Sequence, residues 1–178
     1  LMWTGNAAVT VLPALQPLPF DPLKDFAPIS ISLSMPSVIA VNNDLPIKTI
    51  TELIAYAKAN PGKLSYGTPG VGTPQHVATE LFCKLAGIKM EHIPYRGANF
   101  SDTLGGSVPV AVQNAGAMMP LVRDGRLRGL AVTSLKRSED TQNLPTLDAS
   151  GFKGLEAMSR LALPAPFGRP QPTLGRGG

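Results

Sequence analysis

A glycine-rich turn inside the stretch LSYGTPGVGTPQHVATELFCKLAG contains the residues best suited to chemistry in this sequence. Gly70 and Gly72 allow backbone angles that other residues resist. Thr73 is a typical N-cap, and Pro74 suits the first position of a helix. The amides of the turn and of the first helical residues should converge at the positive end of that helix. The pattern favours an anion site, and the alternative is an ordinary connection between a strand and a helix.

A phosphate and a carboxylate are the two kinds of anion that this segment, the Gly70–Thr73 turn, could bind. A Walker A phosphate loop is excluded, because no Gly-Lys-Ser or Gly-Lys-Thr follows the glycines. A dinucleotide loop is closer, since Gly70 and Gly72 form G-x-G and Glu91 lies at a suitable distance for a ribose. However, Gln75 stands where the third glycine belongs. We therefore expect a carboxylate.

The turn needs a helix behind it, and the sequence predicts one that ends at Gly87. Its apolar residues recur at helical spacing and are predicted to form its buried face: Val77, Ala78, Leu81, Phe82 and Leu85. Cys83, the single cysteine, cannot form an internal disulfide and is predicted to lie in the core. An earlier helix is predicted to begin at the capping box of Thr49 and Glu52.

Strands are predicted to alternate with these helices. Beside the short strand before the turn, they lie at Lys89–Tyr95, Val108–Val112 and Leu127–Thr133. This order predicts an α/β fold with a mostly parallel sheet. Ligands of such sheets bind at the carboxyl ends of strands, where Gln113 and Asn114 join the turn as candidate site residues.

Composition excludes several classes of protein. The 178 residues are 43% hydrophobic and 16% charged, which predicts a packed core rather than disorder. The formal charge is +4 with scattered Lys and Arg, so no nucleic-acid partner is expected. No signal peptide or membrane span is visible. Motifs for catalysis or metal binding are missing too, and we expect no enzyme, cofactor or metal site.

Five stretches together resemble the Bug receptors, the TctC family of periplasmic solute-binding proteins that serve tripartite tricarboxylate transporters. In family order they are LPFDPLKDFAPIS, ELIAYAKANPGKLSYGTPGVGTPQHVATELFCKLAGI, HIPYRG, LGGSVPVAV and DGRLRGLAVTSLKRS. The resemblance implies a two-lobed fold, like that of periplasmic binding proteins, which closes on a small carboxylate. It also implies a periplasmic location and a membrane permease as partner.

The resemblance implies a set of ligand-binding residues around the turn: Thr68, Gly70, Val71, Gly72, Thr73, Gln75 and His76. The Thr73 hydroxyl could bind the ligand or cap the helix. His76 matches the histidine of the family motif, where packing or hydrogen bonding is its commoner role, and His92 is predicted to pack in the core. Gln113 replaces the usual Asp of the family, which suggests a preference for a plain carboxylic acid over an amino acid.

The resemblance also predicts three segments. Residues 1–36 are a partial first lobe with a crossover, 37–131 a complete second α/β lobe, and 132–178 a return crossover with the irregular tail of the first lobe. An incomplete first lobe would expose apolar surface, so we expect self-association. Three functions are compatible with this sequence: a carboxylate receptor, a nucleotide-binding α/β enzyme domain that uses the Gly70–Thr73 turn, or a non-binding remnant.

Overall fold

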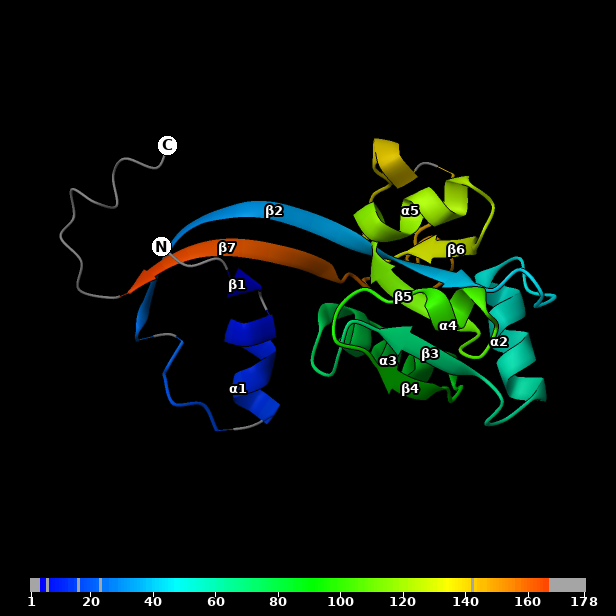
Figure 1. The fold of residues 1–178 in the computed structure, drawn as a ribbon, viewed down its shortest axis with the longest axis horizontal. Helices are drawn as coiled ribbons and strands as arrows, with labels where there is room; N and C mark the ends of the chain where they lie inside the picture. The colour runs from blue at the N-terminus through cyan, green and yellow to red at the C-terminus, as the bar shows by residue number, and fades with distance from the viewer. Residues whose placement is uncertain (1–3, 6, 16, 23, 142, 167–178) are drawn as a thin grey trace. The chain divides into compact units, whose positions relative to one another are not determined.

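The computed structural model describes residues 4–5, 7–15, 17–22, 24–141 and 143–166 (Figure 1). The chain divides into two compact units, one from 1–34 and 159–178 and the other from Met35–Met158. All the predicted site residues lie in the Met35–Met158 unit. Residues 132–158, which the sequence prediction assigned to a return crossover, also belong to this unit.

The first unit has few regular elements in its described part: β1 (Thr4–Gly5), a π-helical turn η1 (Ala7–Val11), α1 (Leu12–Leu15) and parts of β2 (Phe26–Val41) and β7 (Met158–Pro166). β1 pairs with β7 in antiparallel register, with Thr4 opposite Ala162. The Ser32 hydroxyl donates to the Leu161 carbonyl at 3.0 Å. These contacts join the two ends of the chain within this unit.

The Met35–Met158 unit is a mixed sheet with helices around it. Its strands lie in the order β6–β2–β5–β3–β4. Its elements after β2 are α2 (Ile50–Ala59), β3 (Ser65–Thr68), α3 (Pro74–Ala86), β4 (Glu91–Pro94), α4 (Ser101–Leu104), β5 (Val110–Asn114), α5 (Ala115–Arg123), β6 (Arg128–Val132) and the 3₁₀ turn η2 (Glu139–Thr141). β3 is parallel to β4 and β5, whereas β2 is antiparallel to β5 and β6. The α/β class is confirmed, and the sheet is more mixed than predicted because β2 enters it in the opposite direction.

Both faces of the sheet are buried. Val110 and Val112 of β5 pack with α2 and α3, while Ala111 between them packs with α5. This alternation follows from the two-residue period of a strand. In Figure 1, α5 lies beside β6. Two apolar layers therefore hold the strand ends that carry the predicted site.

The prediction of the buried face of α3 was partly wrong. Ala78 and Phe82 are buried as expected, but three predicted core residues are about half exposed: Val77 (46%), Leu81 (45%) and Leu85 (57%). Gln75 and Thr79 are buried on this helix. The Thr79 hydroxyl donates to the Gln75 carbonyl at 2.7 Å, and this hydrogen bond allows the hydroxyl to be buried.

Candidate functional site

The Gly70–Thr73 turn connects the end of β3 to the start of α3, as predicted. Gly70 has φ 155° and Gly72 has φ 76°, both in the range that favours glycine. Thr73 is the N-cap, and its hydroxyl accepts from the His76 amide at 3.4 Å and donates to the Gly70 carbonyl at 2.8 Å. Of the two predicted roles for this hydroxyl, the structure shows capping.

The amides of the turn are not free, contrary to the sequence expectation of open donors. The Gly70 N–H donates to Thr68 Oγ1 at 3.3 Å, and the Gly72 N–H donates to His76 Nδ1 at 3.2 Å. The Thr73 N–H donates to the Gly70 carbonyl at 3.4 Å. The Gly72 bond is at the long end of the ordinary range and the other two are longer still, so all three are weaker than a typical backbone hydrogen bond. For the Val71 N–H, the structure gives no acceptor among the described residues.

Two stacked histidines lie beside the turn. The rings of His76 and His92 have centroids 4.1 Å apart and planes 20° apart, and Tyr66 stacks on His92 at 4.9 Å. His92 Nε2 is 2.7 Å from the Thr68 hydroxyl. Burial, and then the charge of His76, lowers the pKa of His92. His92 was expected only to pack in the core; strand pairing with Tyr66, which no local pattern shows, places it under the turn.

Gln75 and Asn114, both candidate site residues, are in contact near the ends of the neighbouring strands β3 and β5. Gln75 Nε2 donates to Asn114 Oδ1 at 2.6 Å, and Gln75 is 2% exposed. The contact joins the first turn of α3 to the end of β5. It therefore fixes the turn against the sheet.

Gln113 is placed differently from Asn114. Successive residues of a strand point to opposite faces of the sheet, so its side chain lies on the other face of β5. Gln113 is buried, and its Nε2 has no hydrogen-bond partner among the described residues. A buried donor without an acceptor is costly, so this amide is a candidate for a further contact.

Comparison with known proteins agrees with the sequence resemblance. A family model described as "Tripartite tricarboxylate transporter family receptor" matches residues 2–176. The chain belongs to this receptor family. BugT of Bordetella pertussis is 33% identical over 171 residues, which cover 94% of this chain and 52% of BugT.

Solved structures show the same fold. Periplasmic binding protein BugD superimposes with a TM-score of 0.87 at 31% identity, covering 97% of this chain and 58% of BugD. Rpa4515 of R. palustris, solved with adipate, superimposes with a TM-score of 0.83 at 33% identity. The match covers 89% of this chain and 54% of Rpa4515. The chain spans about half the length of the curated relatives it matches.

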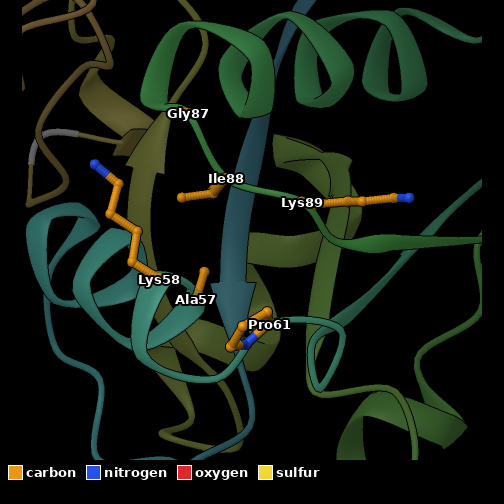
Figure 2. Close-up of a pocket in the computed structure, with 6 residues that line it drawn as sticks. All are labelled: Ala57, Lys58, Pro61, Gly87, Ile88 and Lys89. Atoms are coloured by element: carbon orange, nitrogen blue, oxygen red, sulfur yellow. The ribbon is translucent and has the colours of Figure 1, made fainter.

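A cavity lies beyond the C-terminal end of α3, away from the turn. Its volume is about 420 Å³, and it is lined by residues from the end of α2, the turn after α2 and the segment after α3: Ala57, Lys58, Pro61, Gly87, Ile88 and Lys89 (Figure 2). The two lysine side chains point away from each other in Figure 2. They do not converge on one point, and the cavity is separated from the turn by the 13 residues of α3.

Two kinds of feature are missing from the described part of this receptor-family chain. It contains no group of three or more His, Cys, Asp or Glu side chains that could hold a metal ion. None of its helices has the length and apolar character needed to cross a bilayer.

Proposed function

We propose that this chain binds a small organic carboxylate at the Gly70–Thr73 turn, in the periplasm, and serves a membrane permease. The proposal depends on one observation above all. The N–H of Gly72, a left-handed glycine at the start of a 13-residue helix, is held only by a weak 3.2 Å bond to His76. A carboxylate oxygen forms shorter, charge-assisted bonds with such donors, and the positive end of α3 favours its charge.

The proposed ligand is a plain dicarboxylic acid. The relative from R. palustris was solved with adipate, and it is 33% identical to this chain. We propose that Asn114, which contacts the first turn of α3, takes part in recognition. We propose the same of Gln113, from the other face at the carboxyl end of β5, because it offers a buried N–H donor without a partner among the described residues. An amide N–H can donate to a carboxylate. It cannot donate to the ammonium group of an amino acid, which is itself only a donor.

A non-binding family member is the second candidate function. It is favoured by the internal acceptors that the Gly70, Gly72 and Thr73 amides already have. Binding must exchange those bonds for bonds to the ligand. The two candidates therefore differ in whether a carboxylate competes successfully with His76 and Thr68.

Calorimetric titration of the full chain with adipate, glutarate, glutamate and NAD distinguishes these functions. We expect heat of binding with the two plain acids and about tenfold weaker binding of glutamate. Leaving a buried charge or donor unpaired costs on the order of 1–3 kcal/mol, and about 1.4 kcal/mol corresponds to a factor of ten. Binding of NAD instead would favour the nucleotide-binding alternative. No binding of any acid would favour the non-binding candidate.

A matched pair of glycine variants tests the location of the site. Gly72 and Gly62 both have φ 76°, and a Cβ at Gly62 would meet nothing within 4 Å. Gly72→Ala and Gly62→Ala should each cost about 1 kcal/mol of unfolding free energy. Only Gly72→Ala should also weaken adipate binding, by about tenfold or more, because the strained turn re-aims its N–H. Equal affinities in the two variants would place the ligand elsewhere.

A further inference from the structure

The stacked histidines are connected to both glycine amides of the turn. One connection is direct, from the Gly72 N–H to His76 Nδ1 at 3.2 Å. The other passes through a hydroxyl: the Gly70 N–H donates to Thr68 Oγ1 at 3.3 Å, and that oxygen lies 2.7 Å from His92 Nε2. The two rings are themselves in contact, with centroids 4.1 Å apart. One titratable pair therefore holds two of the donors that the proposed function assigns to a carboxylate.

We propose that proton uptake by the His76–His92 pair releases the Gly72 amide to the ligand, so that carboxylate binding at the turn is coupled to one proton. The inference rests on the proposed function of the turn. In the observed arrangement His76 Nδ1 accepts a hydrogen bond, so this nitrogen carries no proton. A protonated imidazole has N–H groups at both nitrogens and cannot accept. The Gly72 N–H would then lose its acceptor.

A carboxylate fits the protonated arrangement. Its oxygens can accept from the Gly72 N–H and from the new Nδ1–H of His76, which replaces one weak neutral bond by two bonds to a charged acceptor. Binding and protonation therefore strengthen each other. Because this linkage is reciprocal, the ligand must bind more tightly as pH falls through the histidine range.

The pair should take up one proton rather than two. Two positive rings at 4.1 Å repel each other, and burial together with the charge of His76 lowers the pKa of His92. Only a proton on His76 Nδ1 removes the acceptor of the Gly72 N–H, so this is the proton that the proposal requires. Of the other groups that face the pair, Tyr66 of β3 stays neutral because its pKa is raised by burial, and Glu80 of α3 opposes the lowering at His92 through its negative charge.

Nuclear magnetic resonance of the ligand-free chain tests the release step by itself. The chain has only two histidines, so a titration near neutral pH can be traced to this pair. We expect the Gly72 amide shift to change together with the ring signals of the pair when pH is lowered through the histidine range, from about 8 to 5. In His76→Gln the amide retains an oxygen acceptor that does not titrate, and the Gly72 shift should become flat. A flat Gly72 shift in the unaltered chain, or an unchanged titration in His76→Gln, would overturn the inference.

Calorimetry with adipate tests the coupling. Between about pH 8 and 6.5 the acid stays ionised while a histidine titrates, so affinity should rise about tenfold, with uptake of about one proton seen as a dependence on buffer ionisation heat. In His76→Gln the ratio of the two affinities should fall to about one. If the unaltered chain binds adipate with the same affinity at both pH values, the inference is overturned and the proposed function stays intact. If the Gly72 amide shift changes with pH but adipate binds at neither pH, the proposed function is rejected. The effect of the histidines on the Gly72 amide would then still stand.

Discussion

Glu80 influences two buried groups that ionise only at high pH. Its carboxylate accepts from the Tyr66 hydroxyl at 2.5 Å. Burial, and then this hydrogen bond and the charge of Glu80, raises the pKa of Tyr66. Burial, and then the negative charge of Glu80, raises the pKa of the Cys83 thiol to about 12. Both groups therefore stay protonated at neutral pH.

The raised pKa of Cys83 makes its thiol unreactive in the folded chain. We expect reaction with an aromatic disulfide reagent at pH 8 to be at least about a hundredfold slower in the native chain than in urea, because the thiolate is the nucleophile and the thiol is buried. Stopped-flow absorbance measures the two reaction rates, with Cys83→Ala as the blank. Fast native reaction would contradict the burial of this side chain.

The same shift affects stability at alkaline pH. Folding raises the pKa of the thiol from 9.0 to about 12, so the unfolded chain ionises first. This contribution to stability is complete below pH 9 and is lost as pH rises toward 12. Urea unfolding of the unaltered chain should give a lower free energy of unfolding at pH 10 than at pH 8. In Cys83→Ala this decrease should be smaller. Equal losses would exclude Cys83 as the cause.

Helix α3 shows which parts of an element can be predicted from sequence. Its ends were predicted correctly, because Thr73 and Gly87 act within a few residues: Thr73 caps the first turn, and Gly87 has the left-handed φ of 63°. Its buried face was predicted only in part. Leu81 and Phe82 are both apolar and adjacent, and only the position of the sheet decides that Phe82 is the buried one. Tertiary packing thus overrides local periodicity.

A pair of truncations on α3 tests this assignment. Phe82 is 0% exposed and packs edge-to-face on Phe152 with ring centroids 4.9 Å apart, whereas Leu81 is 45% exposed. We expect Phe82→Ala to cost about 3–5 kcal/mol of unfolding free energy and Leu81→Ala about 0.5 kcal/mol. Urea unfolding measured by circular dichroism gives both values. A large loss in Leu81→Ala would mean that this face of α3 is covered in solution.

The candidate site depends on distant parts of the chain. The turn and Asn114 were predicted from sequence, since glycines, caps and strand ends are local signals. The role of His92 was not, because it depends on the parallel pairing of β3 and β4. Nor could the internal acceptors of the Gly70 and Gly72 amides be predicted, since they require side-chain positions. The N–H donors of the turn can thus be predicted from local sequence. The internal acceptors that compete with a ligand for them can be found only from the fold.

Two large apolar side chains on β2 are exposed. Ile31 is 61% exposed and Leu33 is 40% exposed, and their spacing of two places them on one face of the strand. We predict that the chain associates with itself as its concentration rises, because such side chains lose apolar contact with water when two copies meet. Sedimentation velocity over a hundredfold range of concentration measures the effect.

Charge substitutions locate the surface that associates. The double variant Ile31→Glu with Leu33→Glu should sediment as a monomer at concentrations where the unaltered chain does not, since burying two carboxylates is unfavourable. Leu135→Glu is the matched control, because Leu135 is also exposed, at 45%, but lies after β6. It should leave association unchanged. If the unaltered chain sediments as a monomer at every concentration, Ile31 and Leu33 have no partner copy; if Leu135→Glu alone disperses the chain, the contact lies on the Met35–Met158 unit instead.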